Sequence, residues 1–188
     1  MDALTTELFD RAAAGHYDTQ TALHEAAHAI AYDHVGLDFL SVSITDAITE
    51  VPPRRIDAWD RAVVSMAGPA MEGLIIQHRD DLTDAEVVAW IDAADRDSKQ
   101  FAADEGEFAE PNDYTQADGY STAALPVALA IVCAHIDAVA RIAEAALSSP
   151  ECLSYADAKS MLPTERTDVA EQLQHWQRMA EEGRADDE

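Results

Sequence analysis

The sequence contains few cysteines and no long apolar run. Its two cysteines, Cys133 and Cys152, are too few for the disulfide framework of a small secreted domain. Cys133 stands in an apolar segment, so we expect it to be a small core residue. The longest apolar run, 123–134, is well short of the roughly twenty residues that a membrane-spanning helix needs. The sequence therefore predicts no membrane-spanning segment.

Basic residues are equally scarce. The chain has 12 Lys and Arg against 37 Asp and Glu, which gives a formal net charge of −25 at pH 7. Such a protein lacks the basic face that neutralises nucleic-acid phosphates, and anionic membrane surfaces repel it. Hydrophobic residues make up 48% of the chain, which favours a folded domain with an acidic surface over a disordered acidic segment. We therefore expect neither nucleic acid nor membrane as a partner.

The length and the N-terminal composition set two further expectations. A chain of 188 residues is typical of a single domain, predicted here as 1–188, with a last helix and an acidic tail over 163–188. The first ten residues carry acidic but no basic side chains, unlike a secretory signal. These features predict a cytoplasmic protein.

The spacing of apolar residues predicts a mainly α fold with a small β element near 39–46, where residues alternate and several are β-branched. Pro69 predicts a kink or break inside the second long helix. The segment 104–120 is rich in Asp, Glu, Gly and Pro, which indicates an exposed loop that is simply solvated, acts as a lid or receives a basic substrate. Helices are predicted over 19–35, 57–79, 83–103, 121–147, 154–162 and 165–182.

The residues that suggest chemistry lie together in the first long predicted helix, as His24-Glu25-Ala-Ala-His28. Residues i and i+4 share one face of a helix, so both imidazoles can bind one metal ion, and neutral imidazole suits Zn²⁺. Glu25 is placed to act as the general base for metal-activated water. The neighbouring residues are apolar nearly all round the helix, which favours a buried active-site helix over a solvated face that carries two histidines by chance.

Two histidines do not complete a catalytic zinc site, which usually has three protein ligands. His34 is a poor third ligand because it faces elsewhere on the same helix. The longer H-E-x-x-H-x-x-G-x-x-H pattern also fails, because Ala31 stands at its glycine. The third ligand is therefore expected to be a carboxylate. The candidates are Glu72, Asp92, Asp95 and Asp97.

Several segments resemble the FtsH-type zinc metallopeptidases. The segment 21–30, T-A-L-H-E-A-A-H-A-I, resembles the active helix of that family, and V-S-I at 42–44 resembles its strand. The segments 65–75, S-M-A-G-P-A-M-E-G-L-I, and 95–102, D-R-D-S-K-Q-F-A, resemble its next two helices. The resemblance extends over about 19–162 and implies a zincin-like helical peptidase domain.

The same resemblance assigns roles to particular residues. It implies that His24 and His28 bind Zn²⁺, that Glu25 is the catalytic base, and that the third ligand is the aspartate at position 97, with Asp95 as the alternative. Under a gluzincin interpretation Glu72 would be the third ligand instead. Its other possible role is to accept a hydrogen bond from a ligand histidine. The strand near 42–44 is expected to bind the substrate backbone along its edge.

Some features of that family are missing or changed in this sequence. Its members carry a transmembrane segment and an AAA+ ATPase, whereas no lysine here follows a glycine, so a phosphate-binding G-x-x-x-x-G-K-[ST] loop is absent. Ala27 and Pro69 replace a glycine and an arginine of the family pattern. The sequence thus predicts a stand-alone zinc metalloendopeptidase that does not itself use ATP. It would act on peptides or flexible proteins, alone, as a homo-oligomer or with a separate ATPase.

The alternative is a metal-binding adaptor that does not hydrolyse its partner. The intact Glu25 favours the enzyme, because binding alone does not require a glutamate at that position.

Overall fold

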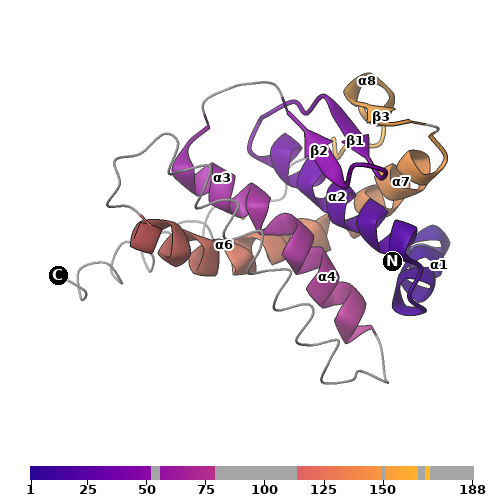
Figure 1. The fold of residues 1–188 in the computed structure, drawn as a ribbon, viewed down its shortest axis with the longest axis horizontal. Helices are drawn as coiled ribbons and strands as arrows, with labels where there is room; N and C mark the ends of the chain where they lie inside the picture. The colour runs from indigo at the N-terminus through magenta and orange to yellow at the C-terminus, as the bar shows by residue number, and fades with distance from the viewer. Residues whose placement is uncertain (52–55, 79–113, 150, 165–167, 170–188) are drawn as a thin grey trace.

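The computed structural model describes residues 1–51, 56–78, 114–149, 151–164 and 168–169. Within these ranges it is mainly helical with one small antiparallel sheet, as predicted (Figure 1). The helices are α1 (Ala3–Ala13), α2 (Tyr17–His34), α3 (Ala58–Ser65), α4 (Ala67–Gln77), α6 (Tyr114–Ala134), α7 (Ile136–Leu147) and α8 (Tyr155–Ala158). The strands are β1 (Ser41–Ser43), β2 (Ile48–Glu50) and β3 (Leu153–Ser154).

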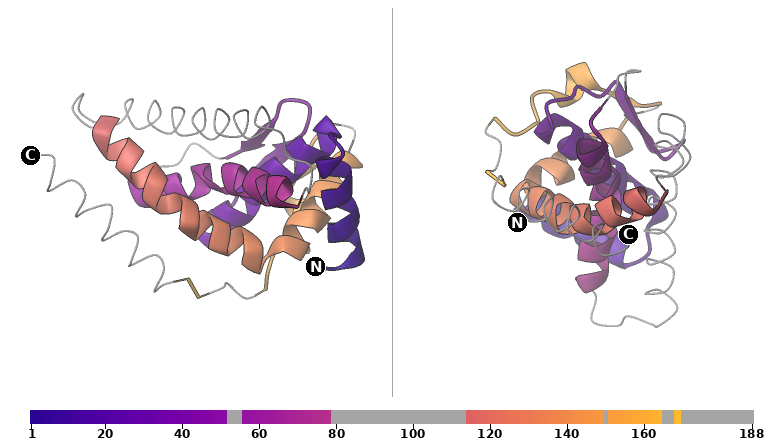
Figure 2. Two further views of the ribbon diagram at one scale, coloured as in Figure 1. Left: turned by 90° about the horizontal axis from the view of Figure 1, so that it is seen from below. Right: turned by 90° about the vertical axis from the view of Figure 1, so that its left-hand side faces the viewer.

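Helix α2 is the central element and corresponds to the helix predicted over 19–35. It makes its most extensive contacts with α7 and α4, and it also touches the sheet, α1, α3 and α6 (Figures 1 and 2). Five of its alanines are fully buried, at positions 22, 26, 27, 29 and 31. A helix enclosed by others is apolar on most of its faces, which explains why this one shows no clear polar stripe.

The predicted strand 39–46 is a hairpin instead of one strand. The chain turns after β1, with Ala47 at φ 49°, and returns as β2. The strand order is β2-β1-β3, and Val42 pairs with Thr49 on one side and Leu153 on the other. The segment 42–44 was therefore wrongly predicted to be a binding edge, because β1 is the central strand. The turn lacks the Gly or Asn that usually marks a hairpin, so the sequence pattern did not predict the second strand.

The helix predicted over 57–79 is interrupted at Met66. Met66 is the C-cap of α3 and also the N-cap of α4. Pro69 is the third residue of α4, in the first turn, where a missing N–H interrupts no helical hydrogen bond. The predicted break therefore occurs three residues before the proline itself, and the last carbonyls of α3 are left available to other donors.

Two helices replace the helix predicted over 121–147. Helix α6 ends before His135, and its last part and α7 are inclined at 79° to each other. Helix α6 also begins at Tyr114, so the end of the predicted loop 104–120 is helical. Cys133, expected in the core, is exposed near the end of α6. Among the described residues no single helix is long and apolar enough to cross a membrane, although this bent pair would qualify by length and composition together.

Helix α1 was not predicted, although Leu8, Phe9 and Ala12 carry a helical pattern and are buried. Asp2 caps the helix, and the Asp137 carboxylate of α7 accepts from the Asp2 N–H at 3.0 Å and the Thr5 hydroxyl at 2.8 Å. The hydrogen bond from the Thr5 N–H lowers the pKa of Asp2, and that from the Asp2 N–H lowers the pKa of Asp137. This junction attaches α1 to α7.

The short helix predicted over 154–162 is present as α8 and covers only 155–158. Ser154 caps it, as expected, with its hydroxyl accepting from the Asp157 N–H at 3.3 Å. Tyr155 donates a hydrogen bond to Asp38, and this bond raises the pKa of Tyr155 to about 12. The contact joins α8 to the chain just before β1. The helices predicted over 83–103 and 165–182 lie outside the described residues, apart from 168–169, which are not helical.

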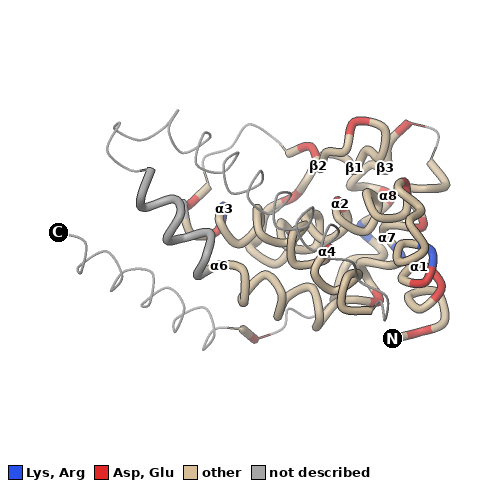
Figure 3. The backbone as a smooth tube through the Cα atoms, turned by 60° about the horizontal axis from the view of Figure 1, so that its bottom comes forward, with Lys and Arg blue, Asp and Glu red and all other residues tan. Residues whose placement is uncertain are grey.

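Acidic residues recur around the described part of the chain, whereas basic residues are few (Figure 3). Because like charges on a folded surface repel, we expect screening by salt to stabilise the protein. Between about 0.05 M and about 2 M KCl the melting temperature should rise by about 5 °C, which corresponds to about 2 kcal/mol in the free energy of unfolding. Differential scanning fluorimetry would measure this shift, with an uncharged osmolyte as the control. An unchanged melting temperature would contradict the expectation.

Candidate metal centre

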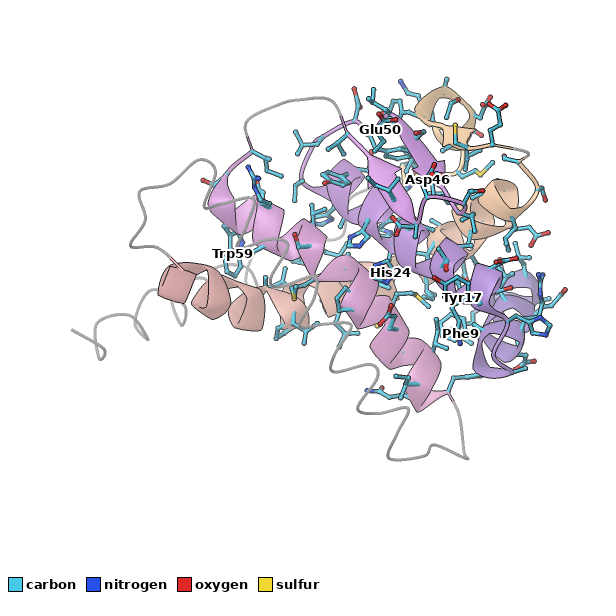
Figure 4. All side chains as sticks on the ribbon, viewed as in Figure 1. Phe9, Tyr17, His24, Asp46, Glu50 and Trp59 are labelled. Atoms are coloured by element: carbon cyan, nitrogen blue, oxygen red, sulfur yellow. The ribbon has the colours of Figure 1, made fainter. Side chains whose placement is uncertain are left out.

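His24 and His28 converge on one point beside α4. They lie one turn apart on α2, and their Nε2 atoms are 3.0 Å apart. Figure 4 shows His24 between α2 and α4 in the middle of the molecule. The ring centroids are 4.8 Å apart and the rings meet edge to face. The helical i, i+4 spacing therefore brings two imidazole nitrogens together, as the sequence predicts.

The other nitrogen of each ring is held by the α3–α4 pair. His28 Nδ1 lies 2.8 Å from the carbonyl oxygen of Val64, in the last turn of α3. His24 Nδ1 lies 2.8 Å from Oε1 of Glu72 on α4. A backbone carbonyl can only accept, and so can an ionised carboxylate, so each Nδ1 carries the hydrogen and donates it. Both contacts thus orient the rings.

These hydrogen bonds turn the two Nε2 atoms toward each other. In a neutral imidazole with a hydrogen on Nδ1, Nε2 presents a lone pair. At 3.0 Å the two Nε2 atoms can share a proton in an N–H···N hydrogen bond or bind one metal ion, whereas two bare lone pairs at that distance would repel. Two nitrogens at 2.0–2.1 Å from a tetrahedral Zn²⁺ would stand about 3.3 Å apart, within a few tenths of an ångström of the separation found here. The donor pair therefore fits zinc.

Gly68 brings the backbone of α4 against His24. A Cβ built at this glycine would overlap the imidazole ring at Nε2 and Cε1, and would lie 2.6 Å from Cδ2. No side chain larger than hydrogen fits there without moving the ring. Gly68 and Glu72 are four residues apart and so share one face of α4. That face therefore both contacts the ring of His24 and accepts its Nδ1 hydrogen bond.

Glu25 points away from solvent and is 5% exposed. The hydroxyl of Thr49, in the middle of β2, lies 2.8 Å from the Glu25 carbonyl oxygen and 3.0 Å from its Oε2. The single hydroxyl hydrogen is shared between these two oxygens. The predicted base therefore lies between α2 and the sheet, next to His24 in the chain.

The remaining predicted ligands do not join this group in the part of the chain that is described. Asp92, Asp95 and Asp97 fall within 79–113, outside the described residues. Glu72 contacts His24 through Nδ1, which is the orienting role given above as the alternative to that of a ligand. His34 lies beside His135, with ring centroids 6.5 Å apart. Among the described residues no set of three or more His, Cys, Asp or Glu side chains is arranged to hold a metal.

The comparisons with protein-family models, with characterised proteins and with solved structures found no match to this chain. A function for this chain therefore has to be inferred from its residues and their geometry.

Three residues that contact His24, Glu25 or His28 were not predicted from the sequence. Val64 acts through its carbonyl, which every residue type has, so no sequence signal exists for it. Gly68 stands inside the A-G-x-A-x-E segment, where a glycine in the first turn of a helix suggests close packing. Thr49 belongs to a strand that the pattern did not separate from β1, and only the hairpin brings it to Glu25.

Proposed function

We propose that this protein is a zinc-dependent metalloendopeptidase that cleaves peptide bonds without itself using ATP. The observation that carries the proposal is the His24–His28 pair, whose Nε2 atoms face each other at 3.0 Å while both Nδ1 atoms donate to acceptors. A solvated helix face needs no such pair of acceptors. Histidines that bind a metal commonly have them, because the second hydrogen bond fixes the ring and its tautomer.

His24 and His28 would hold the metal, and Asp97 is proposed as the third ligand with Asp95 as the alternative. Zinc held there would polarise the substrate carbonyl and lower the pKa of water to about 7. The Glu25 carboxylate would take a proton from the attacking water and pass it to the leaving amine. Val64 and Glu72 would keep both imidazoles in the tautomer whose Nε2 lone pair points toward the metal.

The substrate is proposed to be an extended peptide or a flexible protein segment. Strand β2 has β1 on one side, and no described strand pairs with its other side. Residues Ile48 and Glu50 of β2 are exposed, whereas Thr49 between them contacts Glu25. A substrate that adds to this edge as a further strand would run past the base. The candidate binding edge is therefore β2 and not 42–44.

The first experiment measures metal content per chain, by plasma mass spectrometry, in protein purified without a histidine tag or chelator. We expect about one zinc per wild-type chain and none in His28→Ala, because one imidazole cannot hold the site. Asp97→Asn should lower zinc content and Asp95→Asn should not; the reverse result would assign the third ligand to Asp95. Wild-type protein that binds no metal even after zinc is added would refute the proposal.

A further inference from the structure

Thr49 gives the buried base a fixed partner. It is 8% exposed, and its hydroxyl is 3.0 Å from Oε2 of Glu25. Glu25 accepts no other side-chain hydrogen bond from the described residues, so Oε1 has no donor there. One carboxylate oxygen is thus held and the other is left to accept a proton.

The second contact of Thr49 is with the main chain of the same glutamate. Its hydroxyl is also 2.8 Å from the main-chain carbonyl of Glu25, so it binds the two ends of one residue. A glutamate has three side-chain torsions, and a single anchored oxygen removes most of that freedom. The anchoring group comes from a strand, while the base comes from a helix, so the packing of β2 on α2 sets the position of the carboxylate.

We infer that Thr49 is the positioning residue for the Glu25 carboxylate, which it holds through its hydroxyl from the strand that is proposed to bind substrate. This inference rests on the proposed function for its kinetic consequence, but the position of the carboxylate can be observed without activity. The position of a reacting group matters because a displacement of about 1 Å can lower a rate by about 100-fold.

The test compares Thr49→Val with Thr49→Ser. Valine keeps the shape and the strand preference but removes the hydroxyl, whereas serine keeps the hydroxyl and removes the methyl group. The Glu25 carbonyl retains its helical hydrogen bond in both variants, so the fold is expected to persist. The unfolding midpoint and the zinc content of each variant are measured alongside.

Crystal structures of the three proteins provide the first readout. In Thr49→Val the Glu25 carboxylate should leave its position or occupy several, and in Thr49→Ser it should remain. Kinetics on a fluorogenic peptide provide the second. We expect kcat to fall by roughly 10- to 100-fold in Thr49→Val with KM and zinc content unchanged, and to recover in Thr49→Ser.

Two results would overturn the inference. One is a Glu25 carboxylate that keeps its wild-type position in Thr49→Val, whatever the activity. The other is an equal loss of kcat in Thr49→Ser and Thr49→Val, which would mean that packing and not the hydroxyl matters. If the proposed function is wrong, the wild-type protein will hydrolyse no peptide. The crystallographic comparison would still decide the role of Thr49.

Discussion

A Glu25→Gln variant should bind zinc like the wild type and lose peptide hydrolysis, with kcat reduced by about 10²- to 10⁴-fold. The amide is nearly the same size as the carboxylate, and its oxygen can still accept from the Thr49 hydroxyl. It cannot take up a proton from water, so only the chemistry is removed. Zinc content and kcat on a fluorogenic peptide are the two measurements.

Glu7→Gln is the matched control, because Glu7 is exposed on α1 and has no contact with α2 among the hydrogen bonds and ion pairs described. It removes the same charge without touching the site, and it should leave kcat unchanged. Hydrolysis that persists in Glu25→Gln would exclude Glu25 as the base. Zinc binding without hydrolysis in the wild type would instead favour the adaptor.

Gly68→Ala is the second change with a large expected effect. The added methyl group would occupy the space of the His24 imidazole, so the ring would have to turn away from Glu72 and from His28. We expect zinc affinity to fall by about 100-fold or more, since loss of an orienting contact alone lowers affinity by 10- to 100-fold. Competition with a fluorescent chelator would measure the dissociation constant.

Measuring the stability of Gly68→Ala shows whether a loss of zinc affinity comes from the site or from unfolding. Alanine is a better helix former than glycine by about 1 kcal/mol, so α4 itself should not weaken. Gly15→Ala is the control: a Cβ there meets no neighbour, but φ of +87° strains the backbone. That variant should lower the melting temperature and keep zinc affinity. An unchanged zinc affinity in Gly68→Ala would show that zinc binding does not depend on the present position of the His24 ring.

The sequence predicted one half of the candidate site, the histidine pair with its neighbouring glutamate, because that half is local. His24, Glu25 and His28 belong to one helix, where a spacing of four residues fixes a common face without knowledge of the rest of the fold. The mainly α class and the strand near 39–46 followed from apolar periodicity in the same way. The Pro69 break followed from a property of proline that needs no tertiary contact.

The supporting half depends on contacts between elements distant in the chain. The acceptor at Val64 is a backbone atom, and its availability follows from the end of α3 at Ser65, one residue before the shared cap. Thr49 reaches Glu25 only because residues 44–47 reverse the chain. Helix α1 is too short for its apolar pattern alone to predict it, and its contacts with α7 lie far away in the chain. Propensity alone does not reveal such pairings, which are settled by packing.

The five buried alanines of α2 act as spacers for the site. The distance between two packed helix axes, commonly 8–10 Å, is set by the side chains at their contact. On α2, His28 contacts the Val64 carbonyl of α3 and His24 contacts the Glu72 carboxylate of α4, each at 2.8 Å, so a wider helix spacing would break both contacts. A larger residue at one of these alanines, where α2 packs on α3 or α4, would widen the gap between the helices without changing either histidine. The geometry of the histidine pair therefore depends partly on alanine methyl groups, at positions that carry no reactive side chain.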